Sequence, residues 1–301
     1  MTKNITKNLN LIGNTPLIRI DLNLPKTKIL AKLETYNLTG SIKDRMALHM
    51  MQKAQQRGKL KKGTTIIEAT TGNTGISFAA LSSILGYKMI AVMPENMSQE
   101  RIKILELFGA KIVLTPKEKG PMGAIEKRNK LSRSIANSWA PDQFSNSDNI
   151  KAHKKGIAKE ILAQFSGKID YLVHGIGTGG TLMAIGKVLK QKLPKITVVA
   201  VEPKESPVLS GGEAGNHNIQ GIGEGFIPSL VDRRLIDRVI KVSTHEAIKE
   251  TKMLAKKQGL LVGFSSGANI AAIKKIVKKD NQPKTILTIF ADRGERYLSV
   301  L

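Results

Sequence analysis

The sequence predicts an α/β fold in which mainly parallel strands are flanked by helices. Short runs of β-branched and apolar residues alternate with longer amphipathic stretches, and this alternation is typical of parallel strands joined by crossover helices. The 301 residues are enough for two structural units, at about 100 to 200 residues per domain. Hydrophobic residues make up 41% of the chain, so a buried core is expected.

The individual elements follow from residue type and spacing. The predicted strands are residues 29–33, 65–69, 89–93, 111–114, 171–174, 197–201, 238–242 and 285–290. The predicted helices are residues 41–57, 73–85, 98–108, 122–136, 149–165, 180–192, 244–258 and 266–279. Ser243 and Glu246 have the spacing of a capping box at the start of one helix, and Gly259 is a plausible stop at its end.

Two irregular stretches interrupt this pattern. Residues 139–149 form a polar break, and residues 203–232 are rich in Gly, Ser and Pro. An irregular stretch as long as the second, inside a compact fold, is usually a lid or a binding segment. We therefore expect a larger domain of residues 1–35 and 149–301, and a smaller domain of residues 36–148.

The charge balance makes nucleic acid one candidate partner. The chain has 48 Lys and Arg against 24 Asp and Glu, a formal net charge of +24. The basic residues, however, lie in short runs along the whole chain, and aromatic residues are only 4%. This distribution favours a diffuse coat of solvated lysines, and nucleic-acid binding is kept as the less favoured alternative.

Composition also narrows the chemistry. The chain has no cysteine, which excludes disulfides, Cys-ligated metals and thiol catalysis. The five histidines are scattered without metal-ligand spacing, so no metal site is expected. The N-terminal residues lack the apolar core of a signal peptide, and no apolar run reaches the ~18 residues of a membrane helix. We expect a cytoplasmic protein that does not enter a membrane.

A glycine-rich motif lies between a predicted strand and a predicted helix. Its glycines let backbone N–H groups approach an anion at the positively polarised end of the helix, so the motif predicts a phosphate site. Because Glu202 ends the next strand, where a dinucleotide fold binds its ribose, a nicotinamide-dependent dehydrogenase is one alternative. Tight strand–helix packing is another. The motif runs Gly175, Ile176, Gly177, Thr178, Gly179, Gly180, Thr181.

Lys43 is the candidate nucleophile. Gly40 and Ser41 are expected to start a helix and to place Lys43 in its first turn, where the helix dipole disfavours a cation. A lysine in this position is biased toward the neutral amine, and neutral amines form Schiff bases with carbonyl cofactors. In so lysine-rich a chain, an ordinary solvated lysine is the alternative.

Two further strand–helix turns carry small polar residues. The first turn offers three hydroxyls and an amide, which suit a carboxylate, although plain helix capping explains it equally well. The second turn, around Ser265 and Ser266, could also be capping alone. The residues of the first turn are Thr70, Thr71, Gly72, Asn73 and Thr74.

Taken together and in this order, the motifs resemble the cysteine synthase (O-acetylserine sulfhydrylase) family. The matching stretches are residues 13–17, 41–45, 70–75, 93–101, 142–146, 177–181, 263–267 and 295–299. The resemblance extends from Ile12 to Ser299 and implies a tryptophan synthase β-like fold that uses pyridoxal 5′-phosphate (PLP). The phosphate at the glycine motif would then be that of PLP.

The resemblance also implies a role for each candidate residue. Lys43 would bind the cofactor covalently and, once released, would act as the acid–base group at the substrate Cα. Asn73 would hydrogen-bond the ring hydroxyl of the cofactor, and Ser265 would face its pyridine nitrogen. The phosphate would be held by Gly177, Thr178, Gly179, Gly180 and Thr181. The substrate carboxylate, whose arrival would close the smaller domain, would be bound by Thr70, Thr71, Thr74 and Gln143.

The implied reaction is a β-replacement that makes L-cysteine from O-acetyl-L-serine and sulfide, with loss of acetate. A homodimer and an association with serine acetyltransferase are implied as well. Residues 152–160 depart from the family, which normally reads Ala-His-Tyr and then Thr-Thr-Gly-Pro-Glu, and Leu38 replaces a usual proline. These departures leave open a different second substrate: a cystathionine β-synthase reaction with homocysteine, or a cysteine desulfhydrase that releases sulfide from cysteine.

Overall fold

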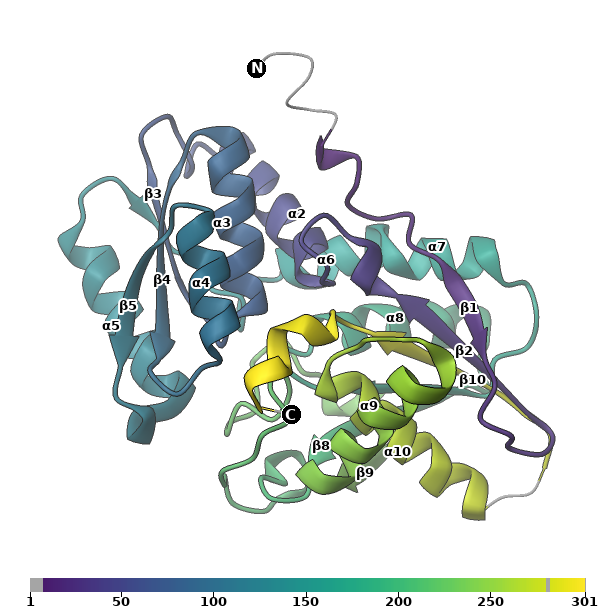
Figure 1. Ribbon diagram of the computed structural model, residues 1–301. Coiled ribbons are helices and arrows are strands. Elements are labelled where there is room, and N and C mark those ends of the chain that lie inside the picture. The colour runs from purple at the N-terminus through teal and green to yellow at the C-terminus, as the bar shows by residue number, and fades with distance from the viewer. Residues whose placement is uncertain (1–7, 280–281, 301) are drawn as a thin grey trace.

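The computed structural model describes residues 8–279 and 282–300. The chain forms two β-sheets, each covered by helices (Figure 1). The predicted α/β class is confirmed. Within the described ranges, no helix is both long and apolar enough to cross a membrane.

The larger sheet has six strands in the order β1-β2-β10-β7-β8-β9. Only the β1–β2 pair is antiparallel, and the other neighbours are parallel. Parallel strands place their carboxyl ends at one edge of the sheet, which is where ligand sites form in such folds. The strands are β1 (Leu17–Ile20), β2 (Thr27–Leu33), β7 (Tyr171–Gly175), β8 (Thr197–Pro203), β9 (Arg238–Val242) and β10 (Lys284–Phe290).

The smaller sheet has four strands in the order β5-β4-β3-β6, and all of its pairs are parallel. The helices of residues 73–85 and 99–107 cover one face of this sheet, and the helix of residues 120–134 covers the other (Figure 1). The strands are β3 (Thr65–Ala69), β4 (Lys88–Pro94), β5 (Lys111–Thr115) and β6 (Ser138–Trp139).

Helices cover both sheets, and short 3₁₀ helices connect some of the elements. The α-helices are α2 (Lys43–Gln56), α3 (Asn73–Leu85), α4 (Gln99–Leu107), α5 (Gly120–Ser134), α6 (Asp148–Lys155), α7 (Ile157–Gln164), α8 (Gly180–Lys192), α9 (Thr244–Gln258) and α10 (Phe264–Lys279). The 3₁₀ helices are η1 (Glu34–Tyr36), η2 (Lys117–Lys119), η3 (Val208–Ser210), η4 (Arg233–Leu235) and η5 (Gly294–Val300).

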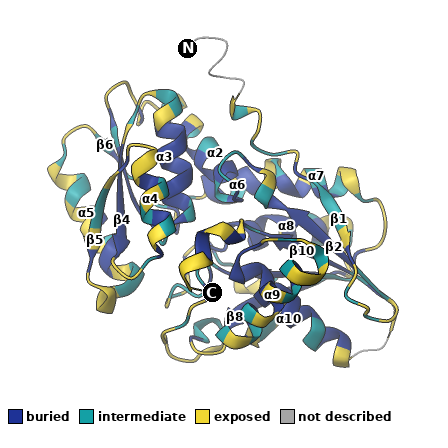
Figure 2. Cartoon of the chain, viewed as in Figure 1, coloured by how far each residue is buried: buried dark blue, intermediate teal, exposed yellow. Residues whose placement is uncertain are grey.

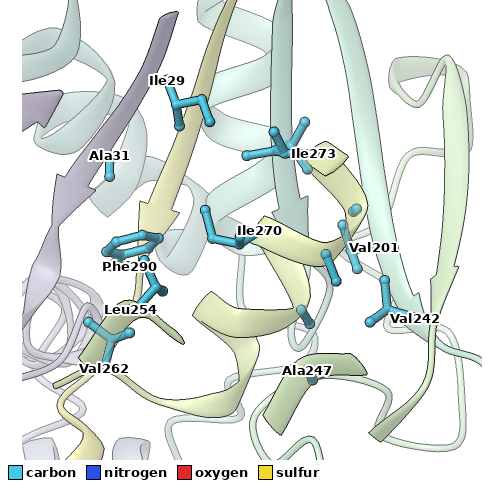
Figure 3. Close-up of a cluster of buried hydrophobic side chains, with 14 of the residues drawn as sticks. Ile29, Ala31, Val201, Val242, Ala247, Leu254, Val262, Ile270, Ile273 and Phe290 are labelled. Carbon is cyan, nitrogen blue, oxygen red and sulfur yellow. The ribbon is translucent and has the colours of Figure 1, made fainter. Parts of the chain in front are cut away.

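The core of the larger unit has two hydrophobic layers, one on each face of the six-stranded sheet. On one face of the sheet, residues such as Ile29 and Phe290 pack against Leu254 of α9 and Ile270 of α10 (Figure 3). On the other face, a second cluster joins the strands to α7 and α8. Because both faces are covered, the central strands are almost entirely buried (Figure 2).

Many predicted elements have the predicted bounds. The strand over 65–69 and the helices over 73–85, 180–192 and 244–258 agree residue for residue with β3, α3, α8 and α9. The capping box is present: Ser243 Oγ accepts from Glu246 N at 3.2 Å, and Ser243 N donates to Glu246 Oε2 at 2.8 Å.

Other expectations were wrong. The single helix expected over 149–165 is two helices, α6 and α7, because Gly156 leaves the helical region with φ −99° and ψ −99°. Strands β1 and β6 were not predicted. β1 is a short, partly exposed edge strand, and β6 has only two residues. Neither is long enough to show a strand pattern.

Candidate functional site

Lys43 begins α2 at the point where the two units meet. The segment before it is tied to the carboxyl end of β10: Ile42 N donates to Ala291 O at 2.8 Å, and Ser41 forms a β-bridge with Asp292. Burial lowers the pKa of the Lys43 amine, while Glu224 and Asp292 oppose this shift. The expected bias toward a neutral amine is therefore present, although its main cause is burial rather than the helix dipole.

The glycine motif joins β7 to α8, and other parts of the chain pack closely against it. A Cβ on Gly177 would lie 2.4 Å from the Gly221 carbonyl, and a Cβ on Gly180 would lie 2.1 Å from Asn149 Oδ1. Gly179 has φ +84°, a conformation that side chains disfavour. The motif lines a small cavity together with Lys43 and Ser265. Glycine is thus required here both by close packing and by backbone shape.

The two threonines of this motif contact α6. Thr178 Oγ1 accepts from Asn149 Nδ2 at 3.1 Å and from Gly180 N at 3.3 Å. Thr181 Oγ1 lies 3.4 Å from His153 Nε2. Both residues are buried in the wall of the cavity.

A second small cavity adjoins the first and shares Lys43, Thr178 and Ser265 with it. Its polar wall includes four of the residues expected to bind substrate or cofactor. Thr74 Oγ1 donates to Gln143 Oε1 at 2.6 Å, and Gln143 Nε2 donates to Ala69 O at 2.9 Å. The four residues are Thr71, Asn73, Thr74 and Gln143.

Thr70 plays a different part in this turn. Its Oγ1 accepts from Gly72 N at 2.9 Å and from Gly75 N at 3.0 Å, so it holds the turn that starts α3. Thr70 therefore supports the start of the helix, which was the alternative to carboxylate binding at this turn. Its hydroxyl proton is still free to be donated. Thr70 does not line either cavity.

Asn73 is held from two sides by residues that sequence reasoning missed. Its Nδ2 donates to Asp292 Oδ2 at 2.7 Å, and its Oδ1 accepts from Arg296 Nη1. Both partners are buried and come from the segment that follows β10. Arg296 belongs to the matched stretch 295–299, which was the only sequence signal for this contact.

Ser265 and Ser266 differ in their surroundings. Ser265 lines both cavities, in the first turn of α10, which begins at Phe264. Ser266 is buried, and its Oγ has no hydrogen-bond partner in the described part of the chain. The capping alternative for this turn therefore does not hold for Ser266, because α10 starts two residues earlier.

Two further charged residues line the second cavity and were not predicted, Arg101 and Glu224. Burial raises the pKa of Glu224, and the nearby Lys43 and Arg101 partly offset this rise. Burial, with a smaller effect from Lys43, lowers the pKa of His174 to about 3. His174 is therefore neutral beside the glycine motif, and it adds no positive charge next to Lys43.

The second cavity adjoins a cleft of about 320 Å³ between the two units, and the two share Thr71, Gln220, Gly221 and Glu224. Residues 94–97 and 117–122 from the smaller unit form one wall, and residues 214–225 form the other. Part of the irregular stretch 203–232 thus lines the cleft, and its role as a binding segment stays a prediction. Glu202, by contrast, accepts from Leu209 N at 2.8 Å and from Ser210 Oγ, so it holds that stretch in place and offers no ribose site.

The arrangement suits one cofactor chemistry. A lysine whose pKa is lowered lies between an anion-binding glycine turn and a group of neutral polar side chains. Glycines whose Cβ atoms would collide with the surrounding chain leave the turn open to a phosphate. The residues present therefore fit PLP, and the fold and site together define a PLP-dependent enzyme of the α/β type.

Comparison with known proteins gives the family. The sequence pattern of the pyridoxal-phosphate dependent enzyme family matches residues 9–292. The chain is 49% identical to "Cysteine synthase B" of Campylobacter jejuni over 289 residues, which cover 96% of this chain and 95% of the relative. The chain belongs to the cysteine synthase family of PLP-dependent enzymes.

Solved structures agree with this assignment. The cysteine synthase of Entamoeba histolytica superposes with a TM-score of 0.91 at 40% identity, covering 100% of this chain and 90% of that one. The O-acetylserine dependent cystathionine beta-synthase of Helicobacter pylori superposes with a TM-score of 0.92 at 39% identity, covering 97% and 96%. The predicted PLP fold is thus confirmed, and the dehydrogenase alternative is rejected.

Proposed function

We propose that the protein makes L-cysteine from O-acetyl-L-serine and sulfide, with release of acetate. The observation that carries the proposal is the place of Lys43, which lines both the glycine-motif cavity and the cavity of Thr71, Asn73, Thr74 and Gln143. The names of the relatives support the same reaction.

Each group then has a task toward the cofactor. Bound PLP would supply an electron sink for the substrate Cα. Lys43 would bind the cofactor and, once freed, would take the proton from Cα, for which its lowered pKa is suited. Ser265 would face the pyridine nitrogen, and Asn73 would bind the ring hydroxyl. Gly177, Thr178, Gly179, Gly180 and Thr181 would hold the phosphate.

The substrate carboxylate would bind at the turn that starts α3. Thr71 offers a hydroxyl and Gln143 offers an amide in the second cavity, Thr74 orients Gln143 by donating its hydroxyl proton to Oε1, and Thr70 supports the turn and has a hydroxyl proton to donate. We propose that residues 36–148 move as a domain against residues 1–35 and 149–301 when this carboxylate binds. Closure of the cleft would exclude water from the reacting atoms.

A second function is favoured by the size of the cleft. Its volume of about 320 Å³ is far more than sulfide needs, and it adjoins the cavity of Lys43. An organic thiol such as homocysteine would fit this cleft, as the name of the Helicobacter pylori enzyme suggests. Release of sulfide from cysteine is the remaining alternative.

Product analysis tests these reactions against one another. Holoenzyme is given O-acetyl-L-serine with sulfide, with homocysteine or with no thiol, and separately L-cysteine alone. Cysteine as the main product supports the proposal. Faster formation of cystathionine, or release of sulfide from cysteine without synthesis, would overturn it.

The assembly and location of the protein are also part of the proposal. A homodimer, an association with serine acetyltransferase and a cytoplasmic location rest on the sequence pattern and the family resemblance. The diffuse distribution of basic residues speaks against nucleic acid as a physiological partner.

A further inference from the structure

Arg101 lies in the wall of the substrate cavity with a buried, incompletely paired guanidinium. It belongs to α4 in the smaller unit, and only 1% of the residue is exposed. Its Nε and Nη1 have no hydrogen-bond partner within the ranges that the structure describes. A buried charge without a partner is strongly unfavourable, so these donors point to an anion that binds beside them.

The guanidinium is fixed from two sides. Its Nη2 donates to the Tyr297 hydroxyl at 3.0 Å, and its Cζ lies 4.7 Å from the centre of the Tyr297 ring. Against its other side is Gly72, where a Cβ would lie 2.2 Å from Arg101 Cδ and 2.3 Å from Nε. Only glycine at position 72 therefore allows the guanidinium to lie directly beside the turn of residues 70–74.

The anion that Arg101 would pair with is a carboxylate bound at the turn of residues 70–74. Thr71, Asn73 and Gln143 have hydroxyl or amide protons that a carboxylate can accept, and Thr74 orients Gln143, but none of the four carries charge. Arg101 lines the same cavity and is absent from the wall of the glycine-motif cavity, where the phosphate would bind. Glu224 also lines the cavity, but it lies near Lys43 as well as Arg101, and Lys43 has the larger effect on it.

We propose that Arg101 is the charge partner of the substrate α-carboxylate, acting from behind the turn at Gly72. This inference rests on the proposed function, because it takes the ligand to be an α-amino acid. It makes the site selective for amino acids with a free carboxylate over amines of the same shape. Tyr297 acts as a positioning residue that holds the guanidinium against the turn.

The test asks whether Arg101 strengthens binding only when the ligand has a carboxylate. The PLP-loaded enzyme is titrated with L-serine and with ethanolamine, which lacks the carboxylate, and dissociation constants are read from the absorption of the bound cofactor. We expect Arg101→Met to weaken L-serine binding about 10- to 100-fold, the range for a hydrogen bond to a charged group, and to leave ethanolamine unchanged. Arg101→Lys is expected to restore most of the preference.

A matched control is Arg57→Met, which removes an arginine paired with Asp148 outside both cavities. Equal weakening of both ligands by Arg101→Met, or a wild-type enzyme that does not prefer L-serine, would overturn the inference. If Arg101→Met does not fold, Tyr297→Phe replaces it, with a smaller loss confined to L-serine expected. Product analysis decides the proposed function separately, because an enzyme that makes no cysteine can still show this coupling.

Discussion

Gln143 is held in one orientation by the residues around it. Its amide donates to Ala69 O and its carbonyl accepts from Thr74, so one Nε2 proton is left for a ligand. Thr71, in contrast, lies between the cavity and the cleft, where its hydroxyl can turn toward an incoming carboxylate. The two residues therefore offer the carboxylate one fixed donor and one adjustable donor.

We expect Gln143→Ala and Thr71→Ala to keep the absorption spectrum of the bound cofactor while weakening the binding of L-serine about tenfold. The reason is that neither residue lines the glycine-motif cavity, so only the amino-acid ligand loses a partner. Titration followed by cofactor absorbance measures this effect. Loss of the cofactor with normal ligand binding would show that the roles are assigned wrongly.

Ser265 lines both cavities and is proposed to face the pyridine nitrogen of the cofactor. A hydroxyl can donate to or accept from a pyridine nitrogen, but it cannot supply a fixed negative charge. Ser265→Asp would place a carboxylate in both cavities and favour the protonated ring by charge pairing. We expect the variant to bind PLP with a shifted absorption spectrum and to turn over O-acetyl-L-serine more slowly.

Ser266 provides the matched control for this change. Its hydroxyl is buried without a hydrogen-bond partner in the described residues, so Ser266→Ala removes no visible contact. We expect an unchanged cofactor spectrum. A spectral change in the Ser266 variant but not in Ser265→Asp would mean that the register of this turn is misjudged by one residue.

At the scale of elements, β3 carries a buried carboxyl that makes stability depend on pH. Glu68 Oε2 accepts from Asp142 N at 2.7 Å, while Oε1 lies 3.9 Å from Arg128 Nη1. Burial raises the pKa of Glu68 to about 7, against an ordinary value of 4.5, although Arg128 opposes the rise. Between these two values the folded protein binds more protons than the unfolded chain.

Glu68 therefore stabilises the fold most at low pH, and its contribution falls as pH rises from about 4.5 to about 7. We expect Glu68→Gln to remove this slope, so that the free energy of unfolding of the variant gains on wild type by up to about 3 kcal/mol between pH 5 and pH 8. Urea unfolding at both pH values measures the difference. A variant with the same pH slope as wild type would contradict the assignment.

Elements could be predicted where the pattern is local. α3, α8 and α9 combine a turn or cap at the start with a long run of helical residues, and β3 is a buried run of β-branched residues. β1 and β6 could not be predicted, because their pairing with β2 and β3 depends on partners outside the short segment itself. Gly156 alone did not reveal that the helix expected over 149–165 would break.

The residues of the candidate site likewise divide into those that local sequence pattern could predict and those that it could not. Lys43, Asn73 and the glycine motif stand next to turns between strand and helix, so their grouping at the strand ends could be inferred. Arg101, Glu224 and Asp292 come from α4, the irregular stretch and the segment after β10, and they reach the site only through tertiary packing. No spacing in the sequence brings these three residues together.

For the whole molecule, the net charge of +24 predicts weak and unselective attraction to nucleic acid. We expect association with duplex DNA to be independent of sequence and to fade as salt rises from about 50 to about 200 mM, because released counterions drive it. Fluorescence anisotropy with two unrelated duplexes measures both properties. Tight binding to one of them at physiological salt would restore nucleic acid as a partner.

The segment η5 lies against α4, so it contacts residues that are far from it in the sequence (Figure 1). Ser98 Oγ donates to Arg296 O across 198 positions, Ser299 bonds Glu100, and Tyr297 holds Arg101. Because chains fold from the N-terminus as they are made, the smaller unit can form before Tyr297 is available to position its Arg101. Chains truncated before residue 294 keep every strand of both sheets, since β10 ends at Phe290, so they should still form the sheets yet bind an amino-acid ligand more weakly.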